Sequence, residues 1–310
     1  MMNISENGLR KIIIEILDKR GVEGSEIIAD HFVEAELRGH SSHGLQRLIP
    51  LVNGLDLGTI KNKLDYKILK KNTNYLLIDA QQSIGIVLWE HLINTYKNTI
   101  IAVKNASHIG FLGYYTRTVA EAGEVAIMFG NAEPVVVMPK TNRKLLSTSP
   151  LSISIPCSPI IVLDMALSAT ARGKIIEAQR KGINIPDGVA VDKNGNITTN
   201  PNSALEGGIL PLGGTKGFYL MLMFDMLTSF LSTSAISPNV KGVLNTQYPS
   251  NKGEVLIKFK PSVYNCYIVQ EFSKLVGDLP GIHSDIIKKE RLKNGIPIND
   301  KLYNDILMLK

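Results

Sequence analysis

The sequence predicts an α/β fold. Apolar runs of strand length alternate with segments of helical periodicity between residues 75 and 130, and this alternation is typical of a sheet covered by helices. The 310 residues are 44% hydrophobic and 20% charged, an ordinary globular composition sufficient for one large domain or two smaller ones. No internal repeat, low-complexity tract or clear linker divides the chain.

Helical patterns occupy the N-terminal part. Residues 1–20 are amphipathic, and the charges among them are not typical of a signal peptide, so secretion is not expected. A second helix is expected over residues 26–38, with Ser25 as its N-cap and Gly39 as its end. The helical pattern resumes over residues 45–55.

Strands and helices then alternate. We expect strands at 75–80, 100–104, 125–130, 151–155 and 160–165, and helices at 85–96, 112–122 and 169–181. Residues 185–212 are rich in Gly, Pro, Asn and Asp and are expected to be a long irregular, functional excursion. The last expected elements are a strand at 255–259 and helices at 263–276 and 285–292.

The segment 217–231 is almost wholly apolar. Its uncharged stretches are shorter than the roughly 20 residues that cross a membrane, and Asp225 in its middle would cost about 2.5 to 3.5 kcal/mol on insertion. We therefore expect a buried core helix, which also contributes to subunit contacts.

Gly213, Gly214 and Lys216 stand just before this helix, and a glycine-rich turn at a helix start is typical of an anion site. The alternative is a tight turn whose lysine points to water.

A histidine follows the strand expected at 100–104. His108 lies in a turn with Asn105, Ser107 and two glycines, and loops at strand ends carry functional residues more often than the elements do. The local pattern alone favours an ordinary loop histidine over a catalytic one.

A second histidine loop precedes residues 45–55. If helical geometry begins by His43, then His43 and Arg47 share a face at a helix N-terminus, an arrangement that suits a carboxylate. The alternative is that the histidines only solvate the turn while Arg47 pairs with a surface acid.

The charge indicates the kind of ligand to expect, and the cysteines indicate the redox environment. The net charge of +6 is spread along the chain without interleaved aromatics, so we expect a small anionic ligand and no nucleic acid. Cys157 and Cys266 are too few and too far apart for a disulfide framework, and without a CxxC motif no zinc site is expected. A reducing cytoplasm fits this pattern.

Several motifs are absent. The sequence contains no G-x-G-x-x-G, P-loop, H-E-x-x-H or G-x-S-x-G motif. Among the six histidines, no pair is supported by carboxylates at metal-ligand spacing, so a metal site is disfavoured.

Taken together, the motifs resemble the type-2 malate/L-lactate dehydrogenase family, which includes ureidoglycolate and sulfolactate dehydrogenases, diketogulonate reductases and cyclic-imine carboxylate reductases. The resemblance covers nearly the whole chain, and its segments are residues 34–39, 42–44 with Arg47, 105–110, 131 with 134, 163–168, 172–174, 211–217, 279–281 and 295–298.

The resemblance implies a nicotinamide enzyme with a non-Rossmann cofactor fold and a mixed sheet. It also implies a helical substrate and dimerisation domain formed by residues 1–115 with 235–310, and a cofactor-binding domain formed by residues 116–234. Such an enzyme transfers a hydride between NAD or NADP and a 2-hydroxy or 2-oxo acid, and acts as a homodimer or a higher homo-oligomer.

Residue roles follow from the same resemblance. His108 matches the general acid/base of some members and His43 that of others, since an imidazole can exchange a proton near neutral pH. Arg47 matches the arginine that holds the substrate carboxylate, with Ser42 and Thr148 beside the substrate. The positions matching the cofactor site are Asn131, Ala132, Leu163, Asp164, Met165, Ala166, Ser168, Lys216, Gly217, Gly281 and His283.

Some positions depart from the family pattern. Residues 147–150 read Ser-Thr-Ser-Pro instead of Gly-Thr-Asn-Pro, and Ala132 replaces a serine. Two alternatives to the 2-hydroxy acid enzyme therefore stay open: a cyclic-imine carboxylate reductase, and a dinucleotide-binding relative without catalysis.

Overall fold

A computed structural model of the chain describes residues 2–243 and 245–310. Its centre is a seven-stranded mixed sheet with strand order β2-β3-β4-β12-β5-β8-β9. Only β3 and β4 pair in parallel, and the other neighbours pair antiparallel. The strands are β2 (Lys67–Lys71), β3 (Tyr75–Asp79), β4 (Ile100–Lys104), β12 (Gly253–Phe259), β5 (Val125–Gly130), β8 (Pro150–Ile155) and β9 (Ile161–Ala166).

Helices cover both faces of this sheet. On one face, α4 (Gly85–Thr95) and α5 (Leu112–Glu121) place Trp89 and Tyr115 against strand residues such as Leu256. On the other, α8 (Thr215–Ser232) packs against the neighbouring position Val255. Side chains that alternate along a strand point to opposite faces, so central strands such as β12 are apolar on both.

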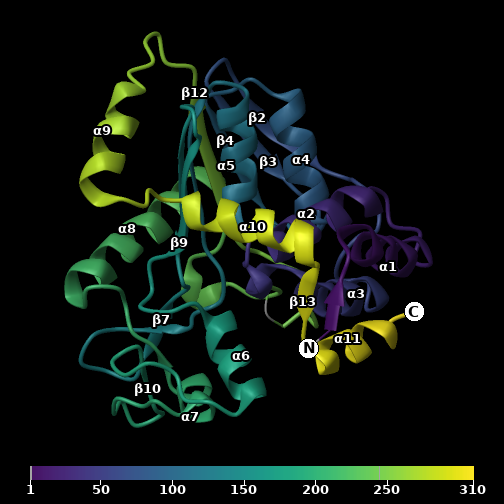
Figure 1. Cartoon of the computed structure of the whole chain (residues 1–310), viewed down its shortest axis with the longest axis vertical. Coiled ribbons are helices and arrows are strands. Elements are labelled where there is room, and N and C mark those ends of the chain that lie inside the picture. Colours follow the sequence, from purple (N-terminus) through teal and green to yellow (C-terminus); the bar gives the residue numbers. More distant parts are fainter. Residues whose placement is uncertain (1, 244) are drawn as a thin grey trace.

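The two ends of the chain meet in a second core. Strand β1 (Met2–Ile4) pairs with β13 (Ile296–Ile298), and the N and C ends lie on one side of the molecule (Figure 1). The helices around this core are α1 (Glu6–Asp18), α2 (Ser25–Leu37), α3 (Leu48–Asp56) and α11 (Asp300–Leu307). Helix α10 (Ile282–Asn294) leads into β13 and packs on α2.

The expected irregular excursion is partly wrong, because residues 185–212 contain three regular elements. These are β10 (Ala190–Val191), α7 (Pro201–Glu206) and β11 (Gly208–Ile209). The two strands join β6 (Val136–Val137) and β7 (Lys144–Leu146) in a four-stranded sheet beside α6 (Arg172–Lys181). Asn200 caps α7 by accepting from the amides of Asn202 and Ser203, a local motif that leaves no trace in hydrophobic periodicity.

Three expectations about single elements are also corrected. Ser25 is the first residue of α2 and not its N-cap, since its hydroxyl donates to Asp18 (2.6 Å) and the cap is Gly24. The apolar helix α8 is not buried throughout, because Tyr219 and Phe230 are 61% and 82% exposed. Strand β2 was not expected, because it is a lysine-rich edge strand without a buried residue and lacks the apolar pattern of a buried strand.

The cysteines are paired. A disulfide joins Cys157, after β8, to Cys266, before α9 (Tyr267–Val276). Their Cα atoms lie 5.5 Å apart although the residues are 109 positions apart in sequence, so sequence distance was a poor guide to spatial distance. The cysteine pattern therefore gives no support for a reducing compartment.

Among the described residues, no helix has the combination of length and hydrophobicity needed to cross a membrane.

Candidate active site

One end of the central sheet gathers the candidate loops. Strands β4 and β5 both end beside the start of β12, where Gly253 pairs with Lys104 and Glu254 with Gly130. At the same end, Pro150 at the start of β8 pairs with Ala166 at the end of β9. The register thus brings together the segments after β4, β5 and β9 and those before β8 and β12.

The loop after β4 carries His108 in a fixed conformation. Gly110 N donates to His108 Nδ1 (2.9 Å), so the neutral ring carries its proton on Nε2. The preceding Ser107 accepts from Gly85 N through its hydroxyl (3.0 Å), which ties the loop to the start of α4. The Nε2–H group is therefore the one that can donate to another oxygen.

His43 lies next to His108. Their ring centroids are 5.8 Å apart, and His43 Nδ1 lies 2.8 Å from Ser42 Oγ. Burial lowers the pKa of His43 to about 3 and that of His108 well below its usual value, and the charge of Arg47 lowers both further. Both rings are consequently neutral at pH 7 before an anion binds.

Arg47 lies in the same pocket as His108, together with Ser107 and the apolar residues Phe32 and Leu51. Its Nε donates to Ser42 O (2.8 Å), and among the described residues neither Nη atom has a hydrogen-bond partner. Burial lowers its pKa to about 10, so the guanidinium is still charged at neutral pH.

The backbone conformation between His43 and Arg47 differs from the expected helix. They do not lie on one continuous helix, because a 3₁₀ turn at Ser41–His43 ends at Gly44 and a second turn, Leu45–Arg47, precedes α3. The bond from Arg47 to Ser42 joins the two turns instead. The start of α6 packs closely against the first of these turns, since a Cβ on Gly173 would lie 2.4 Å from Ser42 Cβ.

The candidate cofactor residues follow β9 along its length. Near its start, Gly281 has a left-handed φ of +91°, and a Cβ there would lie 2.9 Å from Val162 O. Beyond its end, Leu212 N donates to Leu167 O (3.0 Å), which places the glycine turn before α8 against the exit of β9. Leu163, Asp164, Met165 and Ala166 lie between these points and are half-buried.

Asp164 also contacts the helix that follows the His108 loop. Its Oδ2 accepts from Gly113 N (2.9 Å) in the first turn of α5. Burial raises the pKa of Asp164 to about 6, and this hydrogen bond partly offsets the rise. The residue therefore links β9 to α5.

The remaining predicted residues differ in accessibility. Lys216 is exposed in the first turn of α8 and His283 is exposed on α10, whereas Ala132 and Thr148 are half-buried near the end of the sheet. Ser168 is buried and donates to Thr170 O (2.7 Å).

The side chain of Asn131 joins three segments of the chain by hydrogen bonds. Its amide Nδ2 donates to Asp225 Oδ1 (2.9 Å) and Ala235 O (2.8 Å), and its Oδ1 accepts from Gly253 N (2.8 Å). Asp225 also accepts from Ser237 N and Oγ. The sequence indicated Asp225 only as a polar residue in an apolar helix, and nothing pointed to Ser237.

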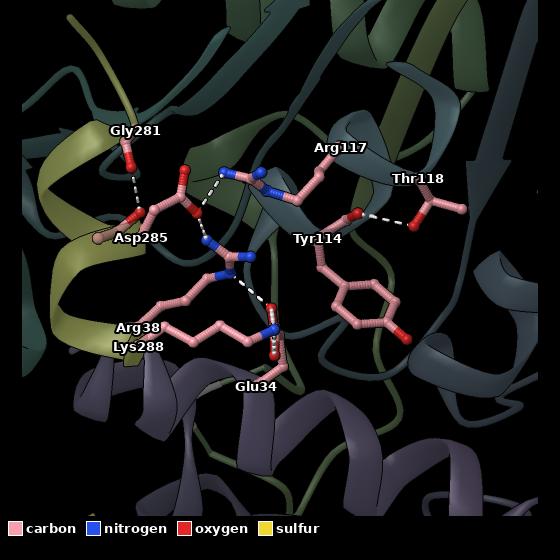
Figure 2. A network of polar contacts seen from close by, with 9 residues as sticks. Glu34, Arg38, Tyr114, Arg117, Thr118, Gly281, Asp285 and Lys288 are labelled. Carbon is pink, nitrogen blue, oxygen red and sulfur yellow. Dashed lines mark hydrogen bonds and ion pairs between the residues drawn. The ribbon is translucent and has the colours of Figure 1, made fainter. Parts of the chain in front are cut away.

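An ion-pair network holds α10 in place (Figure 2). Asp285, in its first turn, pairs with Arg38, the C-cap of α2, and with Arg117 of α5 (3.2 Å). Arg38 and Lys288 both pair with Glu34, at 2.6 and 2.7 Å. The network fixes the helix start that carries Gly281 to both α2 and α5.

Glu36 supports the His43 loop and was not singled out from the sequence. This carboxylate on α2 is 1% exposed and accepts from Leu45 N (2.8 Å), between His43 and Arg47. Burial raises its pKa to about 7. A charged residue on the apolar side of an expected helix was the available indication.

Comparisons with known proteins identify the family. A family model described as malate/L-lactate dehydrogenase matches residues 4–307. The chain is 37% identical to malate/(S)-sulfolactate dehydrogenase of Methanothermus fervidus, covering 97% of this chain and 95% of that protein. It is 30% identical, over 72% of this chain and 69% of the relative, to a Δ1-pyrroline-2-carboxylate/Δ1-piperideine-2-carboxylate reductase of Pseudomonas putida.

The fold is shared as well. A crystal structure of a dehydrogenase from Sinorhizobium meliloti superposes with a TM-score of 0.93 at 31% identity, covering 99% of this chain and 98% of that one. With a matching family model over nearly its whole length and relatives above 30% identity, the chain belongs to the malate/L-lactate dehydrogenase family.

Proposed function

We propose that the protein is an NAD(P)-dependent oxidoreductase that interconverts a small 2-hydroxy acid and the corresponding 2-oxo acid. The observation that carries the proposal is the meeting of His108, His43 and Arg47 at one end of the sheet. A proton-exchanging imidazole beside a guanidinium provides the two groups that a 2-oxo acid requires, one for its carbonyl oxygen and one for its carboxylate.

In this proposal Arg47 holds the substrate carboxylate through its Nη atoms and so directs the carbonyl oxygen toward the imidazoles. His108 directs its Nε2–H at the carbonyl oxygen. The proton that the alkoxide takes up during reduction comes from an imidazolium of the histidine pair, formed when the anionic substrate binds, and the ring that gives this proton returns to its neutral form. In the reverse direction the neutral pair takes up the hydroxyl proton. His43 assists His108 or exchanges roles with it. Ser42 and Thr148 line the substrate side.

The residues present suit a dinucleotide. Gly213 and Gly214 both have positive φ, no atoms lie within 4 Å of a Cβ on either, and α8 begins without a side-chain cap. Gly214 N donates to Pro211 O (3.3 Å), so the amides in the first turn of α8 and the exposed Lys216 would hold phosphate oxygens. The six residues of β9 span about 20 Å, comparable with an extended dinucleotide.

When bound, the nicotinamide would supply or take the hydride. The chain would bind it without a G-x-G-x-x-G turn, in a non-Rossmann arrangement along β9 and the start of α8. The positions involved are Asn131, Ala132, Leu163, Asp164, Met165, Ala166, Ser168, Lys216, Gly217, Gly281 and His283.

The protein is further proposed to form a homodimer or a higher homo-oligomer. The outer side of α8 exposes Tyr219, Met223, Met226 and Phe230, by 61%, 52%, 53% and 82%. An apolar surface of this extent on a helix is typical of a subunit interface.

A cyclic-imine carboxylate reductase is the second candidate, because a relative carries that name. The same Arg47 would hold the carboxylate and the same hydride would reduce a C=N bond. Fluorescence titration with NADH and NADPH, followed by assay of a panel of 2-oxo acids and of Δ1-pyrroline-2-carboxylate, separates the two. Turnover of an oxo acid supports the first function, turnover of the imine alone supports the second, and cofactor binding without any turnover identifies a non-catalytic relative.

A further inference from the structure

A third histidine lies beneath the His108 loop. His31 of α2 is 0% exposed and is surrounded by the rings of Phe111, Tyr114 and Tyr115, whose centroids lie 5.1, 4.4 and 5.4 Å away. Figure 2 shows Tyr114 extending from α5 toward α2. An imidazole is an unusual side chain for so apolar an environment, and its Nδ1 has no partner among the described residues.

The other ring nitrogen of His31 is engaged. Nε2 accepts from Phe111 N (3.1 Å), so the neutral ring carries its proton on Nδ1. Burial lowers the pKa of His31 to about 3, and Nε2 therefore stays an acceptor at neutral pH.

His31 and His108 bond to consecutive amides of one turn. Gly110 N donates to His108 Nδ1 (2.9 Å), and the next amide, Phe111 N, donates to His31 Nε2 (3.1 Å). Tyr115 Oη donates to Ile109 O (2.5 Å). The peptide groups on both sides of Gly110 are thus fixed, the first by His108 and Tyr115 and the second by His31.

Gly110 is specified by the same contact. Its φ is +76°, and a Cβ would lie 1.7 Å from His31 Nε2. Only a glycine allows the chain to approach the ring this closely and to adopt this conformation. The turn and the His31 ring therefore form one packed unit.

We propose that His31 is a positioning residue for the proton donor: through the Phe111 amide it orients the Gly110 peptide, which holds His108 with its proton on Nε2. This inference rests on the proposed function, in which His108 Nε2 faces the substrate oxygen. Without the acceptor, the Phe111 amide would be buried and unpaired, and the turn would rearrange to satisfy it.

Two variants separate hydrogen bonding from packing. His31→Gln can place an amide oxygen close to the position of Nε2 and keeps the acceptor, whereas His31→Leu fills similar space without one. His91→Gln is the matched control, because it makes the same substitution on α4, where the ring of His91 contacts Tyr66. Folding of each variant is checked by urea unfolding.

We expect His31→Leu to lower kcat at least tenfold with little change in the KM of the oxo acid or in NAD(P)H affinity. His31→Gln should recover most of this loss, and His91→Gln should behave as wild type. Equal kcat losses in the Leu and Gln variants would overturn the proposal, because the role would then be packing alone.

A second measurement does not depend on activity. In protein labelled with ¹⁵N-histidine, with the His108 signals identified by their absence in His108→Ala, wild type and His31→Gln should show a bare Nδ1 and a protonated Nε2. His31→Leu should show averaged tautomers, and an unchanged His108 tautomer there would refute the proposal. If wild type reduces neither an oxo acid nor an imine, the proposed function fails, yet this spectrum still tests the positioning role.

Discussion

The imidazole rings of His43 and His108 lie 5.8 Å apart, although one follows α2 and the other follows β4. These two neutral histidines, with Arg47 in the same pocket as His108, are the two candidates for the proposed proton donor.

Replacement of each histidine decides between them. His108→Ala should lower kcat by about 10²- to 10⁴-fold, the usual contribution of a general acid or base, while NADH fluorescence still reports cofactor binding. His43→Ala should cost less if it only assists. The control is His91→Gln on α4, where the ring contacts Tyr66. Full activity of His108→Ala would contradict the assignment.

Arg47→Lys should lower kcat/KM for an oxo acid about a hundredfold, since an ammonium cannot reproduce the two parallel hydrogen bonds of a guanidinium. Steady-state kinetics with the acid and with its methyl ester provide the measurement. The ester should be a poor substrate for both proteins, so the variant loses the preference for the acid. Arg180→Lys, on the exposed end of α6, is the control. A variant that retains the full preference would show that another cation binds the carboxylate.

Glu36→Gln should change the pH dependence of stability. Because burial raises the pKa of Glu36 to about 7, the folded chain keeps a proton that the unfolded chain loses near pH 4.5. The stability contributed by Glu36 is therefore fully present below about pH 4.5 and is lost as the pH rises through about 7.

Glutamine mimics the protonated carboxyl and can still accept from Leu45 N. Relative to wild type, we expect the variant to gain about 2 to 3 kcal/mol between pH 4 and pH 8 in urea unfolding experiments. An exposed acid, Glu290→Gln on α10, should give no such trend. Parallel pH profiles of Glu36→Gln and wild type would show that Glu36 is ionised in the folded protein at neutral pH.

Reduction of the disulfide should lower the free energy of unfolding by about 2 to 4 kcal/mol, because the unfolded chain loses a long closed loop. Urea midpoints with and without dithiothreitol measure this effect. Cys157→Ser should match the reduced wild type and be insensitive to the reductant. A thiol assay that finds two free cysteines in the untreated protein would contradict the pairing.

The strands that are mostly buried could be predicted from the sequence. Strands β4 and β5 have the expected limits, because both are short apolar runs bounded by turn residues. Strand β2 was missed for the opposite reason, since a strand with every residue exposed needs no apolar pattern.

The amino-acid pattern was enough to predict the α/β class, the central strands and, through its motifs, the family. It could not show that His31 and Glu36 of one helix each hold a different histidine loop, or that Cys157 pairs with Cys266; these contacts form only in the folded chain. Periodicity reports which side chains leave water, because burial of apolar area is local and additive along an element. It contains no information on which distant amide a buried acceptor will meet, and that pairing is fixed only when the helices and the sheet pack.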